Sequence, residues 1–223
     1  PYHDHSDERT RAALVARMER ETVVLVSGAG TPLISDPGYK LVRDARAAGR
    51  HVTTLPGPCA AIAGITLSGL PSDRFLFAGF LPNKAKARAD TIAEFAALRA
   101  TLVFYESGPR LSAALAALAE GLGNREAAVA REISKMFEEC VTGTLTELSA
   151  RYADAPPKGE IVVIVGPPGE KPVEDADDAT LDAALREAMA DRPLAQAAKA
   201  VAKRFGLDRP DIYARAPPLN EQA

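Results

Sequence analysis

Charged side chains stand at the ends of two predicted strands, and their types could move a proton or hold an anion. Glu106 follows Tyr105 at the end of one strand. Arg131 and Glu132 end another strand, and Lys135 comes shortly after them. Either glutamate could accept a proton, and either cation could hold a phosphate or favour an alkoxide. We therefore predict catalytic roles for Glu106, Arg131 and Glu132.

A structural interpretation of these residues stays open. Glu106, Arg110, Arg131 and Glu132 could instead form a set of ion pairs at the edge of a domain. Networks of this kind also gather charged groups at one place without any chemistry.

A loop of small residues is a second candidate site. The stretch "VVLVSGAGTPLISDPG", residues 23–38, runs from β-branched residues into serine, glycine and proline. Glycine lets a ligand approach the main chain, since no Cβ blocks it. Gly28 and Gly30 are followed by Leu33, so the third glycine of a dinucleotide fingerprint is missing, and no Walker lysine is present.

A similar turn, "LPGPCAAI", follows the next predicted strand and opens a helix. Amides at the carboxyl end of a strand face the crevice in which α/β sheets bind ligands. Two such turns on one edge favour a ligand cleft, although a strand-ending turn without a ligand remains the alternative for each.

Hydrophobic patterns predict alternating strands and helices, and so an α/β fold with crossover connections. Strands are expected at residues 23–26, 51–55, 74–80, 101–107, 127–132, 137–142 and 159–166. Helices are expected at residues 8–20, 38–49, 59–67, 83–98, 108–122, 145–152, 181–189, 194–205 and 210–215. We predict four segments: the remainder of an N-terminal α/β domain at 1–73, a second α/β domain at 74–166, a Pro-rich acidic linker at 167–180 and a C-terminal helical segment at 181–216.

Composition excludes several classes of protein. The chain has 223 residues, an apolar fraction of 47% and a formal net charge of −3. Its two cysteines, Cys59 and Cys140, and the lack of a Cys/His cluster do not indicate a disulfide-built or zinc-built fold, and they fit a reducing cytoplasm. No apolar run approaches the ~18 residues that a membrane span requires, and no secretory leader opens the chain. Since the chain is not basic, a nucleic-acid role would have to come from a local patch or from a structured partner.

Taken in order, the motifs resemble those of a known family. They are "PYHDHS", "SGAGTPLISDPGYKLV", "LPGPCAAI", "LPSDRFLFAGFLP", "FYESGPR", "AREISKMFEE" and "KGEIVVIV", with "PLAQAAKAVAKRFGLDRPDIY" in the tail. The chain resembles the tetrapyrrole methylase superfamily, and within it the bacterial enzymes that methylate the 2′-oxygen of a cytidine in small-subunit (16S) ribosomal RNA. The resemblance covers nearly the whole chain.

The resemblance implies two α/β domains of tetrapyrrole methylase type with S-adenosyl-L-methionine in the cleft between them, plus a small C-terminal helical appendage. It also implies a cytoplasmic homodimer that needs no metal and no membrane, with ribosomal RNA of the small subunit as its partner. The donor contacts that it implies fall on Ala29, Gly30, Thr31, Ile34, Cys59, Ala60, Ala61, Tyr105, Gly159 and Glu160.

The sequence also departs from the family pattern. The family normally opens with a strand, a "GTPIGN"-like loop and an acidic "EDTR" segment, and we expect these to be missing here because the chain starts at Pro1, just before "YHDH". Gly28 stands where the family usually carries Asp, and Pro109 stands where it often carries His.

The basic stretch "NKAKAR" could contact RNA phosphates, although a solvated helix face is the default interpretation. We predict RNA contacts for Lys84, Lys86, Arg88, Arg110 and Lys135. His3 and His5 have the spacing of a metal pair but no third ligand nearby, so no metal is expected. Two other functions stay open: methylation of a precorrin-type tetrapyrrole, and a truncated, non-catalytic product that only binds ribosomes.

Overall fold

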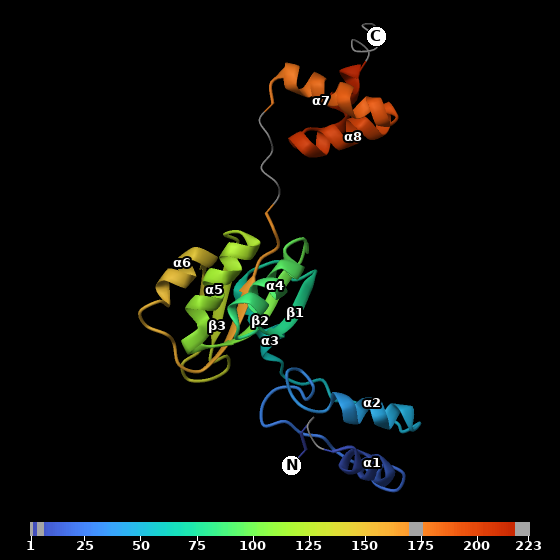
Figure 1. Ribbon diagram of the computed structural model, residues 1–223, viewed down its shortest axis with the longest axis vertical. Coiled ribbons are helices and arrows are strands. Elements are labelled where there is room, and N and C mark those ends of the chain that lie inside the picture. The colour runs from blue at the N-terminus through green and yellow to red at the C-terminus, as the bar shows by residue number, and fades with distance from the viewer. Residues whose placement is uncertain (1, 4–6, 170–175, 217–223) are drawn as a thin grey trace. The chain divides into compact units, whose positions relative to one another are not determined.

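The computed structural model describes residues 2–3, 7–169 and 176–216, which divide into two compact units at Pro168/Gly169. Figure 1 labels most of their elements. The helices of the first unit are α1 (Glu8–Arg17), α2 (Tyr39–Ala47), α3 (Ala60–Ser68), α4 (Ala85–Phe95), α5 (Gly108–Leu122) and α6 (Leu145–Arg151). Its strands are β1 (Phe75–Phe80), β2 (Thr101–Ser107), β3 (Glu126–Arg131), β4 (Glu139–Thr144) and β5 (Glu160–Val165).

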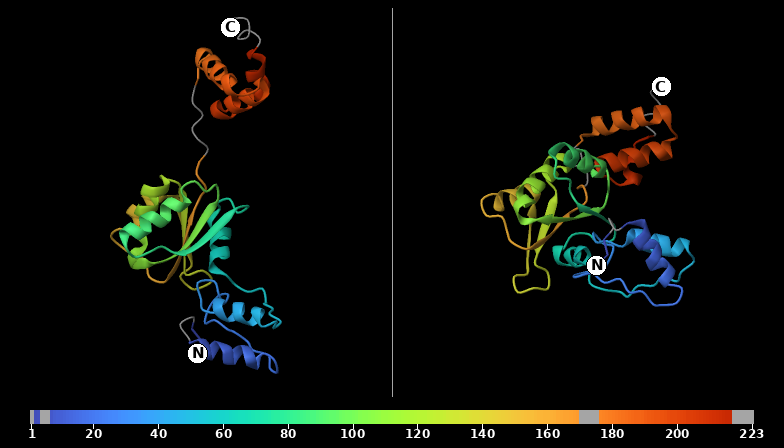
Figure 2. Two further views of the ribbon diagram at one scale, coloured as in Figure 1. Left: turned by 45° about the vertical axis from the view of Figure 1, so that its right-hand side comes forward. Right: turned by 60° about the horizontal axis from the view of Figure 1, so that its bottom comes forward.

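A single mixed sheet organises the first unit. Its strand order is β1-β2-β5-β3-β4. β1 and β2 are parallel, whereas β5 runs antiparallel to both of its neighbours, and β3 and β4 are antiparallel. Helices α4, α5 and α6 cover one face of the sheet and α3 covers the other, as the two views of Figure 2 show.

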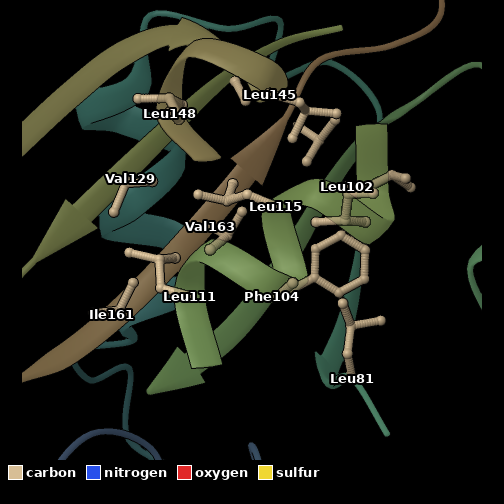
Figure 3. Packing of buried hydrophobic residues seen from close by; sticks show 14 of the residues in the cluster. Leu81, Leu102, Phe104, Leu111, Leu115, Val129, Leu145, Leu148, Ile161 and Val163 are labelled. Atoms are coloured by element: carbon tan, nitrogen blue, oxygen red, sulfur yellow. The ribbon is translucent and has the colours of Figure 1, made fainter. Parts of the chain in front are cut away.

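The core lies on both faces of this sheet because β5 is apolar on both. Alternate side chains of a strand point to opposite faces. Ile161, Val163 and Val165 pack with Leu102, Phe104, Leu111 and Leu115 (Figure 3), whereas Val162 and Ile164 pack under α3 with Ala61 and Ile65. A strand buried on both faces is a continuous apolar run, which is why "IVVIV" gave so clear a strand prediction.

Two glycines allow close packing around this core. A Cβ on Gly64 of α3 would lie 2.9 Å from the side chain of Val162, so glycine brings α3 down onto β5. A Cβ on Gly108 would overlap the backbone carbonyl of Pro157, which passes over the first turn of α5.

Capping residues fix several helix starts. Asp7 accepts a hydrogen bond from the N–H of Thr10 at the start of α1, and Asp177 does the same for Thr180. Thr144 and Glu147 form a reciprocal capping box that starts α6 directly after β4. These side chains satisfy N–H groups that the first helical turn leaves without partners.

The two predicted strands at residues 23–26 and 51–55 were wrong. Both segments are irregular, and Val24, Val26 and Leu55 are 74%, 79% and 86% exposed. A strand needs a neighbour whose N–H and C=O groups complete its ladder, and no described residue supplies one here. Another small correction is that β4 begins at Glu139, because residues 132–138 form the turn between β3 and β4.

The second unit is a small helical body. It consists of α7 (Asp178–Asp191), α8 (Leu194–Phe205) and α9 (Arg209–Ala214), and these surround Leu185, Phe205 and Ile212. Part of the predicted linker, residues 170–175, lies outside the described residues, and its predicted end at residue 180 is already inside α7. The division of the first unit at residue 73 stays a prediction. Among the described helices none has the length and apolarity to cross a bilayer.

Candidate functional site

The predicted catalytic residues lie at one edge of the sheet, beside the start of β5. Since β5 is antiparallel to both β2 and β3, the ends of those two strands and the start of β5 lie side by side. The register pairs Ile161 of β5 with Glu106 on one side and with Arg131 on the other. The strand order therefore brings together residues that the sequence places far apart.

Alternation along the strands then sorts these side chains onto two faces. Tyr105 belongs to the α3 face, with Val103 and Ala130. Glu106 and Arg131 continue the alternation of Phe104 and Val129, which belong to the other face. Tyr105 and Glu106 are neighbours in the sequence, but their side chains lie on opposite faces of the sheet.

Tyr105 joins the sheet to the start of α3. Its hydroxyl oxygen accepts a hydrogen bond from the N–H of Ala61 at 3.2 Å and lies 4.0 Å from Sγ of Cys59. The ring also packs edge-on against Phe77 and Phe80 of β1, with centroids 4.8 and 5.7 Å away. Burial raises the pKa of Tyr105 to about 12, so this hydroxyl is neutral at physiological pH.

The two small-residue turns lie against each other, as the sequence predicts. The hydroxyl of Thr31 donates to the carbonyl of Pro58 at 2.8 Å, directly before Cys59, the N-cap of α3. Gly30 has φ +69°, a conformation that glycine adopts without strain, and this turns the loop toward Pro58. Nothing lies within 4 Å of the place where a Cβ on Gly28 would stand, so this stretch of main chain is open.

A carboxylate–ammonium network fixes the start of β5. Oε1 of Glu132 accepts from the N–H of Glu160 at 2.9 Å and from Nζ of Lys135 at 3.0 Å. The same Nζ lies 2.9 Å from Oε2 of Glu160. The N–H of Glu160, followed by the Lys135 ammonium, holds the pKa of Glu132 below its usual range. Gly159 must be glycine, because it has φ +101° and a Cβ would collide with the Glu132 carboxylate.

Glu106 and Arg110 form an ion pair at the start of α5. The Glu106 side chain is 1% exposed, and its Oε2 lies 3.3 Å from Nη2 of Arg110. Nη2 also donates to the carbonyl of Leu81 at 2.6 Å, while Oε1 of Glu106 accepts from the N–H of Ser107. This pairing favours the structural interpretation of Glu106, and its role as a proton acceptor stays a prediction.

Arg131 is held more loosely, at the rim of the sheet. Its guanidinium donates to the carbonyl of Lys158 at 3.3 Å and lies 3.4 Å from Oε2 of Glu139. Its Nε is buried and has no partner among the described residues. Arg131 thus retains donor capacity that the contacts within the chain do not use.

The remaining predicted RNA contacts lie at the start of α4. Lys84 is the exposed N-cap residue of that helix. Lys86 pairs with Asp90 at 3.4 Å across an exposed helix face, and Nη1 of Arg88 lies 3.4 Å from the carbonyl of Asn83. The geometry of Lys86 and Asp90 is that of a solvated face, so the RNA contacts stay predictions.

Several residues of this site were missed in the sequence. The hydroxyl of Ser27 donates to Oδ2 of Asp36 at 2.5 Å and braces the glycine-rich loop. Their position at the two ends of "SGAGTPLISD" was the available signal. Phe77 and Phe80 were predicted only as strand residues, and nothing in the pattern indicated that both would pack against Tyr105.

In the part of the chain that the structure describes, no three His, Cys, Asp or Glu side chains are grouped as metal ligands. Of the two histidines that could have been a metal pair, His5 lies outside the described residues.

Comparisons with known proteins match both units. The family model for tetrapyrrole (corrin/porphyrin) methylases matches residues 2–149. The model for the RsmI C-terminal HTH domain matches residues 175–217.

Similar full-length sequences share one name. A protein of Erythrobacter litoralis called ribosomal RNA small subunit methyltransferase I is 58% identical over 215 residues, which cover 96% of this chain and 75% of the relative. Proteins with the same name from Mesorhizobium japonicum and Escherichia coli O157:H7 are 46% and 41% identical, and they cover 96% and 95% of this chain. The aligned region spans 73% and 74% of those two relatives.

Solved structures agree on the fold. The methyltransferase CobJ matches with a TM-score of 0.55 at 18% identity, over 75% of this chain and 74% of that one. Diphthine synthase matches with a TM-score of 0.54 at 17% identity, over 71% of this chain and 65% of that one. These likenesses confirm the predicted methylase-type α/β fold, and the sequence identities confirm the predicted family. The chain belongs to the ribosomal RNA small subunit methyltransferase I family of the tetrapyrrole methylases.

Proposed function

We propose that the protein transfers a methyl group from S-adenosyl-L-methionine to the ribose 2′-oxygen of a cytidine in small-subunit ribosomal RNA. The observation that carries this proposal is the 58% identity, over 96% of the chain, to a ribosomal RNA small subunit methyltransferase I. The match of the tail to the RsmI C-terminal HTH domain adds support, because it extends the family resemblance beyond the methylase domain.

Small residues allow a methyl donor to approach the main chain here. No atom lies within 4 Å of the place where a Cβ on Gly28 would stand, and Ala60 and Ala61 begin α3 beside the Tyr105 hydroxyl. When bound, the donor supplies a methyl group on a positively charged sulfur, so the transfer requires no metal. We assign donor binding to the two turns, with Ile34, Cys59 and the Gly159–Glu160 edge completing the site.

Alignment of the hydroxyl with the methyl group is the main task left to the protein. Glu132 is a weak base because its pKa is lowered, which supports a role in fixing the Gly159–Glu160 edge. Lys135 pairs with Glu160, and Arg131 donates to the carbonyl of Lys158, so both cations contact this edge. We propose that they favour the alkoxide or hold a neighbouring phosphate, while Lys84, Lys86, Arg88 and Arg110 contact RNA further out.

The proposal includes a homodimer in the cytoplasm, as the family resemblance implies. Sedimentation at several concentrations tests the dimer, and a single monomeric species would remove it from the proposal.

Transfer of tritium from labelled donor tests the function directly. Small ribosomal subunits that lack the modification are one substrate, and a precorrin-type tetrapyrrole is the other. We expect label in RNA, within a dinucleotide that resists alkali, because a 2′-O-methyl group blocks cleavage at its ribose. Label in the pigment would favour the tetrapyrrole alternative. Ribosome binding without any transfer, and without heat on titration with donor, would favour a non-catalytic product.

A further inference from the structure

Charge is segregated within the second unit. Helix α7 carries Asp178, Asp182, Glu187 and Asp191. Helix α8 has no acidic residue and carries Lys199, Lys203 and Arg204. Because the chain as a whole has a net charge of −3, a helix with cations alone is a local departure from the average surface.

Four exposed cations line one hollow of about 500 Å³ on this unit. They are Arg192 after α7, Lys199 and Lys203 on successive turns of α8, and Arg209 at the start of α9; we refer to them as the cationic face. The opposite side of α8 is buried against α7 and α9 through Val201 and Phe205. Packing of the helix thus directs Lys199 and Lys203 outward.

Among the described residues, no carboxylate pairs with the cationic face. Arg215 of the same unit is paired twice, at 3.0 Å with Asp178 and at 2.8 Å with Asp182. By contrast, no described carboxylate lies within ion-pair distance of Arg192, Lys199, Lys203 or Arg209. Like charges placed together without counterions repel one another, and an anionic partner relieves that repulsion.

The lining of the hollow favours a phosphate backbone over other anions. Ala195 and Ala200 are small, so a chain of phosphates can approach the helix closely, and Gln196 offers a hydrogen-bond donor. No aromatic side chain lines the hollow on which a base could stack. Contacts of this kind position an RNA without reading its sequence.

We propose that the cationic face of the second unit binds the phosphate backbone of the RNA substrate, as a site separate from the methyl-transfer edge of the first unit. The inference rests on the proposed function, because that function supplies the RNA. On this inference, the second unit contributes part of the affinity for RNA and part of the salt dependence of that affinity. The first unit selects the nucleotide that is methylated.

The test is a Lys199→Gln/Lys203→Gln double variant of the full chain. Binding to small ribosomal subunits and to a mixed-sequence 20-nucleotide RNA is measured from 50 to 300 mM salt. Removing two phosphate contacts should weaken binding about tenfold and reduce the slope of log K against log [salt] by about 1.4. Lys199→Arg/Lys203→Arg should bind like the parent, because charge is what matters here.

An Arg46→Gln/Arg186→Gln variant is the matched control, since it removes the same charge from two exposed arginines outside the cationic face. Parent-like binding by the Gln double variant, or an equal loss in the control, would overturn the inference. So would equally tight binding of a polyglutamate peptide, which would indicate an acidic protein partner. Methyl transfer is followed in the same samples: a parent chain that binds RNA through this face but transfers nothing refutes only the proposed function.

Discussion

Two nearly identical tetrapeptides differ in secondary structure and burial in this protein. "VVLV" at residues 23–26 is irregular, and Val24 and Val26 are 74% and 79% exposed. "VVIV" at residues 162–165 is the centre of the sheet, where no residue is more than 3% exposed. Local β-propensity is the same in both. The difference is that β5 has β2 and β3 on its two sides, with helices above and below.

Strand identity is thus a property of neighbours more than of the segment itself. Four substitution tests probe this contrast, and three of them include a matched change elsewhere in the chain. They run from the largest expected effect to the smallest.

Val163→Ala should lower the free energy of unfolding of the first unit by about 3 kcal/mol, because it removes two buried methyl groups and leaves a cavity. Val24→Ala, at the matching position of the exposed tetrapeptide, should change it by less than about 0.5 kcal/mol. Urea denaturation followed by circular dichroism gives both values. Equal effects would mean that residues 23–26 are packed in solution.

Gly108→Ala should cost about 2 kcal/mol, since its Cβ meets a backbone carbonyl that cannot rotate away. Gly28→Ala should be nearly neutral, because no atom lies within 4 Å of the new methyl group. Thermal melting of the two variants makes the comparison. A neutral Gly108→Ala variant would show that the segment around Pro157 is free to shift.

Tyr105→Phe removes the contact that joins β2 to the start of α3, and should cost about 1 kcal/mol because the N–H of Ala61 loses its partner. It should also weaken donor binding, which calorimetry measures. A large loss of stability with unchanged donor affinity would place Tyr105 outside the donor site.

Tyr105 should ionise at a higher pH than an exposed tyrosine. Its pKa is raised from 10.0 to about 12, so the stability linked to this ionisation is complete below pH 10 and is lost as the pH rises through about 12. The difference in absorbance at 295 nm between the parent and Tyr105→Phe, scanned from pH 9 to 13, isolates this group. A midpoint near 10 would contradict its burial.

Lys86→Ala should change stability by less than about 0.5 kcal/mol, because Lys86 and Asp90 pair across a fully solvated helix face. Arg11→Ala should cost more, since the Arg11 side chain is 13% exposed and joins α1 to Asp44 of α2. Chemical denaturation measures the loss of stability in both variants. The reverse order would show that α1 and α2 do not pack as described.

The sequence was most informative where local and tertiary preferences agree. All five strands of the sheet and the helices could be predicted, because apolar periodicity and turn residues mark them locally. The resemblance also identified the family. The predicted strands at 23–26 and 51–55 failed because their pairing partners are not encoded in the segments themselves.

Side-chain pairing was harder to foresee. The ion pair of Glu106 with Arg110 and the contact of Lys135 with Glu160 depend on strand order, and a single sequence does not reveal that β5 lies between β2 and β3. The two small-residue turns were expected to follow strands on one edge of a sheet. They meet through Thr31 and Pro58, although neither turn follows a strand.

The strand order also has a consequence for synthesis on the ribosome. β5 is the last strand in the chain but occupies the middle of the sheet. Until residues 160–165 have emerged from the exit tunnel, the β1–β2 pair and the β3–β4 hairpin each expose an unsatisfied edge, so the nascent chain must wait for its final strand before the sheet can close.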